Sequence, residues 1–107
     1  MQLTPLELST LIALARLGPD TYAVPLREDI RAFAGRTVAI ATVYASLDRL
    51  HRLGLARMEM SEPRPERGGR ARRQFTLTAA GRARVRQERE HSERLWRGIA
   101  LGSGGDR

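Results

Sequence analysis

The side chains best suited to chemistry in this chain lie on one short segment, residues 42–53. Polar side chains stand there between apolar residues at positions 43, 47, 50 and 53, and they include Thr42, Tyr44, Ser46, Arg49 and Arg52. Apolar spacing of this kind predicts a helix that buries one stripe and leaves its other face free. Hydroxyl and guanidinium groups on a free face can hydrogen-bond phosphates or base edges in a DNA major groove. We therefore predict a recognition helix.

A cationic hairpin is predicted directly after this helix. Gly54 follows the last periodic leucine, where a left-handed helix cap is needed, and residues 55–60 then alternate as a strand does. Residues 61–73 hold five arginines against two acids, with two prolines and paired glycines, which predicts a loop. Phe75 and Leu77 share one face of a second strand, so the arginines belong at a hairpin tip.

Arginines at a hairpin tip have two interpretations. They can follow a phosphate backbone or enter a minor groove, or they can simply keep a loop solvated. The neighbouring recognition helix favours the first interpretation, so we predict DNA contacts from Arg70, Arg72 and Arg73. The exclusive use of arginine for all 19 basic residues carries less weight, because a G+C-rich genome has the same effect.

The composition narrows the classes of function. A net charge of +7 on 107 residues favours a polyanionic partner, and the length suits one domain with a modest core. There is no cysteine, and the two histidines, His51 and His91, lie forty residues apart, so we expect no catalytic residue, no metal site and no cofactor. No segment approaches the roughly 20 apolar residues of a membrane span, and nothing resembles a signal peptide. We expect a cytoplasmic protein.

The first helix is predicted from its start signal. Thr4 suits the N-cap, Pro5 the first turn, and Glu7 closes a capping box, so the helix should run to about residue 17. Its apolar residues surround nearly the whole cylinder, whereas a surface helix of a monomer has one polar face. We therefore expect both faces of this helix to be buried against other parts of the protein or a second subunit.

A second helix is predicted over residues 24–34, with Leu26, Ile30 and Phe33 at core spacing. This helix and the recognition helix would make a helix-turn-helix. The predicted fold class is therefore mainly α (α+β), a winged helix-turn-helix over residues 1–78 whose wing is a two-stranded β-hairpin.

The last predicted helix, residues 79–101 with Thr78 as N-cap, is long and polar. Its large apolar residues gather near its end, so we expect an arm that packs against a second subunit together with the other face of the first helix. The predicted dimer interface comprises Leu6, Leu14, Leu95, Trp96 and Ile99. The alternative is a charged helix that is partly frayed in solution. Residues 102–107 are expected to form a disordered tail.

These features together resemble the PadR family of bacterial transcriptional regulators, from residue 4 to about residue 97. The matching stretches are Leu11-Ile12-Ala13-Leu14-Ala15, Thr42-Val43-Tyr44, Leu47-Asp48-Arg49-Leu50, Gly54-Leu55, Gly68-Gly69-Arg70, Phe75-Thr76-Leu77-Thr78 and Gly81-Arg82. The resemblance implies a winged-helix repressor that dimerises through its C-terminal helix, binds a palindromic operator and is often released by a small, frequently aromatic effector. Ala41 and Ala45 depart from the family's usual glycine and proline, and Gln74-Phe75 stands where a tyrosine pair is expected, which bears on the operator sequence and on the phosphate contacts.

By this resemblance the recognition-helix contacts are Thr42, Tyr44, Ser46 and Arg49, and the wing contacts are Arg70, Arg72 and Arg73. Other interpretations remain open. Thr42 could serve only to start the helix, Tyr44 could pack against the domain edge, and Arg49 could pair with Asp48 or Glu28. A surface ion pair is worth little and would not prevent phosphate binding.

The resemblance also implies that Trp96 is a platform on which an aromatic effector stacks at the dimer centre. The alternative is that Trp96 is plain interface core. Three functions follow from the whole sequence: an operator-binding dimeric repressor on double-stranded DNA, a nonspecific nucleic-acid binder, and a protein-interaction module that uses the end of the last helix. Sequence preference separates the first two, because both depend steeply on salt.

Overall fold

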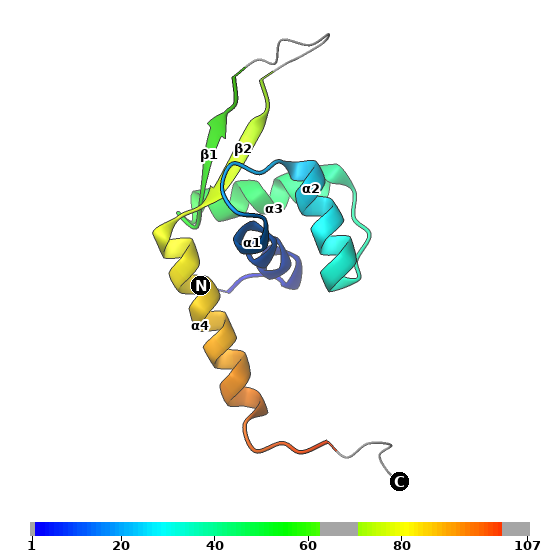
Figure 1. Ribbon diagram of the computed structural model, residues 1–107, viewed down its shortest axis with the longest axis vertical. Coiled ribbons are helices and arrows are strands. Elements are labelled where there is room, and N and C mark those ends of the chain that lie inside the picture. The colour runs from blue at the N-terminus through cyan, green and yellow to red at the C-terminus, as the bar shows by residue number, and fades with distance from the viewer. Residues whose placement is uncertain (1, 63–70, 102–107) are drawn as a thin grey trace.

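The computed structural model describes residues 2–62 and 71–101. The elements in order are α1 (Pro5–Leu17), α2 (Ala23–Asp29), the π-helical turn η1 (Ile30–Ala34), α3 (Ile40–Arg52), β1 (Ala56–Met60), β2 (Arg73–Leu77) and α4 (Ala79–Trp96). Helices α1, α2 and α3 cluster at the centre, while the hairpin and α4 project in opposite directions (Figure 1). The prediction of a mainly helical α+β fold with a helix-turn-helix and a hairpin wing is confirmed.

Helix α1 begins at the predicted capping box. The Thr4 hydroxyl accepts a hydrogen bond from the Glu7 amide at 3.1 Å, and the Glu7 carboxylate accepts one from the Thr4 amide at 2.9 Å. Leu6 and Leu14, which the sequence predicts at a dimer interface, are 9% and 1% exposed and belong to this domain's own core. Their part in a dimer interface stays a prediction.

The second helix changes its winding half-way. Residues 23–29 are α-helical, and residues 30–34 form a π-helical turn. Leu26 and Ile30 are buried as predicted, but the prediction for Phe33 is wrong, since Phe33 is 68% exposed. A π turn holds more residues than an α turn, so the third residue after Ile30 is carried away from the core side of the helix.

Helix α3 and the hairpin complete the core. Val43, Leu47 and Leu50 of α3 are fully buried, as is Phe75 of β2. The strands pair antiparallel from Ala56 opposite Leu77 to Met60 opposite Arg73. An isolated bridge between Thr21 and Phe75 joins β2 to the segment before α2, so the base of the wing is attached to the helical body.

Helix α4 starts where the sequence predicts and ends earlier. The Thr78 hydroxyl accepts a hydrogen bond from the Gly81 amide at 3.0 Å and donates one to the Gly54 carbonyl at 2.7 Å, which ties the helix start to the end of α3. The helix stops at Trp96, because Arg97 is extended and Gly98 has a φ of +81°. The predicted continuation to residue 101 is therefore corrected, and the tail expected over 102–107 lies outside the described residues.

Candidate nucleic-acid interface

The outward face of α3 is the first part of the candidate interface. Thr42, Ala45 and Arg52 are exposed on it, opposite the buried stripe. The helix is N-capped by Ala39, without a side-chain hydrogen bond, so the Thr42 hydroxyl is not its cap. The side chain of Thr42 therefore stands on the outer surface of the first turn, where a DNA groove can be reached.

Ser46 does not share this face. It lies among the buried residues of α3 and is only 6% exposed. The predicted DNA contact from Ser46 stays a prediction, and at 6% exposure its side chain offers little surface for it.

Arg49 has a carboxylate partner that the sequence did not indicate. Its guanidinium lies 3.3 Å from Glu7 Oε2 and 3.5 Å from the Gln2 carbonyl oxygen. Of the partners considered from the sequence, Asp48 pairs with Arg73 and Glu28 pairs with Arg31. Arg49 thus joins the second half of α3 to the start of α1, and the predicted DNA contact from Arg49 stays a prediction.

Tyr44 packs at the edge of the domain and also lines its surface. Its half-buried ring lies 6.5 Å from the Phe75 ring, centroid to centroid. The guanidinium of Arg73 stands over both rings, at 5.0 Å from Tyr44 and 5.4 Å from Phe75, and forms an ion pair with Asp48. Two of the predicted contacts, Tyr44 and Arg73, are therefore next to each other at the junction of α3 and the wing.

Arg72 faces a different environment at the neck of the wing. Its guanidinium stands 5.0 Å from the centre of the Tyr22 ring, and among the described residues no carboxylate pairs with it. The Arg72 amide donates a hydrogen bond to the Ser61 hydroxyl at 2.8 Å, and the Ser61 amide donates one to the Arg72 carbonyl at 2.7 Å, so the backbone of Arg72 is held in place. Arg70, the third predicted wing contact, lies outside the described residues.

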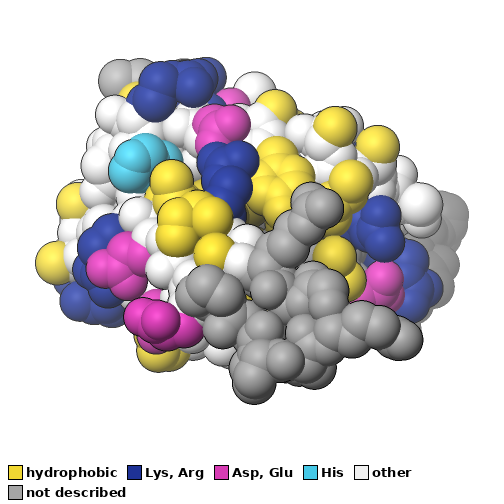
Figure 2. Space-filling view, turned by 90° about the horizontal axis from the view of Figure 1, so that it is seen from above, with side chains coloured by type: hydrophobic (Ala, Val, Ile, Leu, Met, Phe, Trp, Pro, Cys, Tyr) yellow, Lys and Arg dark blue, Asp and Glu magenta, His cyan; other side chains and the backbone are white. Residues whose placement is uncertain are grey.

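An open hollow of about 730 Å³ separates α2 from the neck of the wing. It is lined by Tyr22, Ala23, Val24, Pro25, Tyr44, Met60, Ala71, Arg72 and Arg73. Seen from above the wing, basic and hydrophobic side chains adjoin on this side of the molecule (Figure 2). Guanidinium and phenol groups around an open, partly apolar surface suit contact with a phosphate–sugar backbone.

Two features of this surface were missed from the sequence. Tyr22 lies directly before α2 and supports Arg72, and its hydroxyl accepts a hydrogen bond from Gln74 at 3.1 Å. Arg27 on α2 and Arg31 on η1, four residues apart, border a shallow hollow beside the turn of the helix-turn-helix. The spacing of these two arginines was the available signal, because residues four apart share a helical face.

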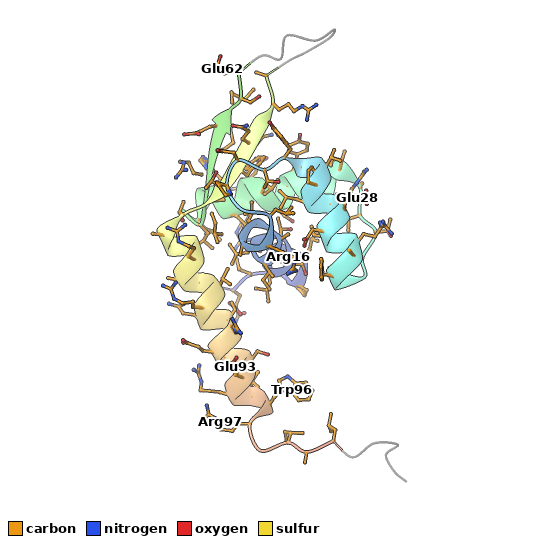
Figure 3. The ribbon with its side chains drawn as sticks, viewed as in Figure 1. Arg16, Glu28, Glu62, Glu93, Trp96 and Arg97 are labelled. Carbon is orange, nitrogen blue, oxygen red and sulfur yellow. The ribbon has the colours of Figure 1, made fainter. Side chains whose placement is uncertain are left out.

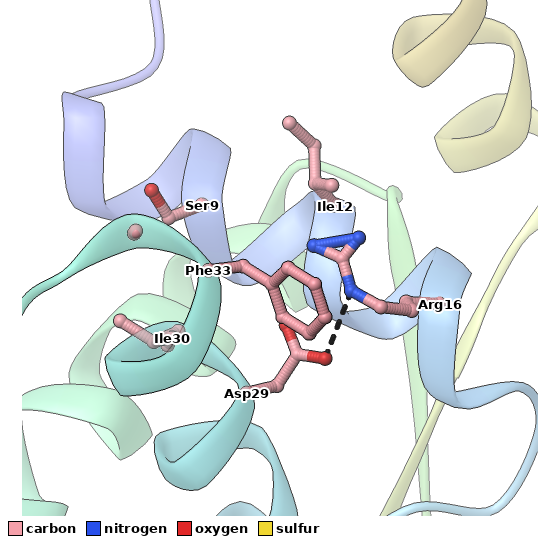
Figure 4. A pocket seen from close by; sticks show the side chains of 7 residues that line it. Ser9, Ile12, Arg16, Asp29, Ile30 and Phe33 are labelled. Atoms are coloured by element: carbon pink, nitrogen blue, oxygen red, sulfur yellow. Dashed lines mark hydrogen bonds and ion pairs between the residues drawn. The ribbon is translucent and has the colours of Figure 1, made fainter.

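A smaller hollow, of about 210 Å³, lies between α1 and η1. There the Arg16 guanidinium stands 3.9 Å from the centre of the Phe33 ring and pairs with Asp29 at 3.0 Å (Figure 4). Asp29 is 8% exposed, so this ion pair satisfies a nearly buried carboxylate. The cluster explains how an exposed phenylalanine is held against the domain.

Trp96 lies at the far end of α4 from the wing (Figure 3) and is 61% exposed. The adjacent Leu95 and the following Ile99 are 66% and 56% exposed. The predicted roles of these residues at a dimer interface, and of Trp96 as an effector platform, remain predictions.

Residues 2–62 and 71–101 contain neither a cluster suited to a metal ion nor a helix suited to a membrane. No three histidine, aspartate or glutamate side chains in that part gather closely enough to hold a metal ion. None of the helices there combines the length and the apolar character needed to cross a bilayer.

Comparisons with known proteins agree with this geometry. The model of the transcriptional regulator PadR-like family matches residues 11–87. No curated protein matches the sequence.

Solved structures share the fold. A PadR-like transcription factor from Bacteroides fragilis is 24% identical, with a TM-score of 0.68 over 84% of this chain and 82% of that one. BpsR of Bordetella bronchiseptica, whose DNA binding is regulated by 6-hydroxynicotinic acid, is 25% identical, with a TM-score of 0.64 over 92% and 68%. F93 from STIV, a winged-helix DNA-binding protein, is 16% identical, with a TM-score of 0.69 over 94% and 100%.

Proposed function

The chain belongs to the PadR-like family of transcriptional regulators, and from this premise we propose that it is a cytoplasmic dimeric repressor that binds a palindromic operator. The observation that carries the proposal is the surface formed by α3 and the neck of the wing. Exposed Thr42 and Arg52 lie on α3, and Arg72 lies on the wing beside a hollow that the two elements share with α2. Base contacts from α3 and phosphate contacts from the wing can be made together from such a surface.

The proposed dimer rests on the end of α4. Leu95 and Trp96 in the last turn of α4, and Ile99 and Leu101 just after it, are all more than half exposed, which is a large apolar group beside so polar a helix. Covering these side chains with the same residues of a second copy buries both sets and creates a two-fold axis. Two α3 helices related by that axis would read half-sites about 34 Å apart, so the operator is expected to be a palindrome.

A small aromatic effector is a further part of the proposal. Trp96 would stack such a compound at the two-fold axis, where a planar ring is received between aromatic faces. The regulation of BpsR by 6-hydroxynicotinic acid, a planar aromatic compound, supports this class of ligand. The effector acts only if it binds one spacing of the two α3 helices better than the other.

The proposal is tested by selecting preferred duplexes from random DNA with the purified protein at about 150 mM salt, where nonspecific binding is weakened. A palindromic consensus supports the operator-binding dimer. Retention of DNA without a consensus would support the nonspecific nucleic-acid binder instead. Loss of all retention would favour a protein-interaction module at the end of α4.

A matched pair of variants makes the selection sharper. Arg72→Gln removes a charge from the proposed interface, and Arg89→Gln removes one from α4, where Arg89 forms an exposed ion pair with Glu93 at 3.4 Å. Both variants lower the net charge equally. Only the first should weaken DNA binding if the interface is where we propose.

A further inference from the structure

We propose that Arg73 is a positioning residue and not a DNA contact: with Asp48 it forms a latch that holds the wing at a set angle to α3. The neighbouring Arg72 then supplies the phosphate contact. This proposal rests on the proposed DNA-binding function and assigns separate roles to two adjacent arginines of the wing.

The latch joins two elements through one guanidinium. Arg73 Nη2 donates to Asp48 Oδ1 on α3, across 25 positions of sequence. The same guanidinium stands over the rings of Tyr44, also on α3, and of Phe75, its own neighbour on β2. A carboxylate at its edge and two rings at its face restrict the orientation of the planar group.

The latch lies far from the base of the hairpin, where an attachment limits the rotation of the hairpin most. Arg73 opposite Met60 is the outermost pair of the two strands, whereas the bridge from Thr21 to Phe75 holds the strands nearer the base. A hairpin attached at one level can pivot about that level. The hydrogen bond from Gln74 to Tyr22 holds one side of β2. The ion pair of Arg73 with Asp48 adds an attachment to α3 at the outermost pair, which restricts the pivot and so sets where the neck of the wing meets a duplex.

The surroundings of the two arginines also separate their roles. Asp48 places a negative charge beside Arg73, and its side chain is 46% exposed, so it would repel a phosphate that approached Arg73. Arg72 has only the Tyr22 ring and no carboxylate partner within the described part of the chain. Its guanidinium can therefore receive a phosphate without first giving up an ion pair.

The direction in which Asp48→Asn changes the affinity for DNA tests the latch. Asp48→Asn removes a negative charge next to the duplex, and if Arg73 were a DNA contact held back by Asp48, the variant would bind more tightly. If the latch positions the wing, the variant binds about fivefold more weakly, a typical coupling for a pair in direct contact. Glu59→Gln is the matched control, because Glu59 is 59% exposed on β1 and, among the described residues, its only ion pair is with Arg57 on the same strand, at 3.7 Å. This control should bind as tightly as the parent or slightly more tightly.

A double-mutant cycle provides the readout that a general loss of stability would not give. Arg73→Gln should weaken DNA binding in the parent protein and have almost no further effect in the Asp48→Asn background. Arg72→Gln should weaken binding equally in both backgrounds and lower the salt slope of log K by about 0.9, the value for one phosphate contact. Additive effects of Arg73→Gln, or tighter binding by Asp48→Asn, would overturn the latch.

The failure of the latch is distinguishable from the failure of the proposed function. If the parent protein binds duplexes and the cycle is additive, the latch alone is overturned. If the parent protein binds no duplex in any salt, the proposed function fails, and the positioning role fails with it because no DNA contact remains to be positioned.

Discussion

The hairpin and the distal half of α4 both project from the helical body, but they are stabilised in different ways. The hairpin is attached to the body by the Thr21 bridge, by the ion pair of Arg73 and by Phe75, whose side chain is fully buried. The distal half of α4 carries ion pairs along its own surface, such as Arg89 with Glu93, and ends in the exposed Trp96. One projection has its partners in the same domain, and the other presents apolar side chains that no described residue covers.

The difference assigns separate tasks to the two projections: the wing is oriented within one subunit, and the end of α4 is available for the proposed dimer. The wing is oriented by contacts within a single subunit, so its angle to α3 does not depend on concentration. In the proposed dimer, the apolar side chains at the end of α4 would be buried against a second copy, so their contribution to stability would depend on protein concentration. Four variants can break or sharpen this comparison.

The largest effect is expected from Phe75→Ala at the base of the wing. Phe75 is fully buried, and removing a buried aromatic ring costs about 4 kcal/mol of unfolding free energy. Phe33→Ala is the matched control, because Phe33 is 68% exposed and should cost less than about 1 kcal/mol. Urea unfolding of both variants measures the difference, and equal losses would contradict the view that the wing is part of the core.

The junction between the wing and α4 should be almost as sensitive. A Cβ added at Gly81 would lie 2.1 Å from the Leu55 carbonyl oxygen and 2.7 Å from Leu77 Cδ1. Gly81→Ala should therefore cost about 2–3 kcal/mol, because backbone of one element must move to relieve the overlap. An unchanged thermal midpoint would show that the two elements separate easily. Ala83→Gly, at a half-buried α4 position two residues later, is a control expected to cost about 1 kcal/mol through helix propensity alone.

At the other projection, Leu95→Asp with Ile99→Asp should weaken the proposed dimer by about 2 kcal/mol or more, since charges would be buried in its apolar centre. The folded domain should keep its unfolding midpoint at concentrations where the parent is monomeric, because both side chains are more than half exposed. Sedimentation velocity over a concentration series measures the association. A variant that still dimerises like the parent would place the interface elsewhere.

The smallest effect is expected from Arg72→Gln, which leaves the fold intact and removes one proposed phosphate contact. Affinity for an operator duplex should fall by a factor of several at about 150 mM salt, with a shallower salt dependence. Arg89→Gln on α4 should change neither quantity. Titrations at three salt concentrations measure both, and equal behaviour of the two variants would remove the wing from the interface.

Local signals explain which features of the fold were predictable. The capping box of Thr4 and Glu7 marked the start of α1, and the apolar period of 43, 47 and 50 marked the buried stripe of α3. Each of these depends on residues within a few positions of one another. The π turn at Ile30 was not predictable in this way, because its residues have no distinctive composition and the wider turn moved Phe33 out of the core.

The residue types of the candidate site could be predicted from the sequence, but the contacts that each side chain makes in the folded protein could be predicted less well. Thr42 and Arg72 lie exposed where the sequence placed them, whereas Ser46 is buried. We predicted Ser46 on the free face of the helix, but the helical period puts position 46 between the apolar positions 50 and 53. Tyr22, which supports Arg72, was missed because it precedes α2 and comes close to the wing only after folding.

The sequence by itself determined the order of the elements, most of their boundaries and the cationic, helix-turn-helix character of the chain, because these follow from caps, turn residues and periodicity. The tertiary structure alone decided which charged groups meet. Arg49 pairs with Glu7 across 42 positions, and Arg73 pairs with Asp48 across 25. Pairings over such separations depend on how whole helices and strands pack, since packing sets the distances between side chains, and no local pattern encodes those distances.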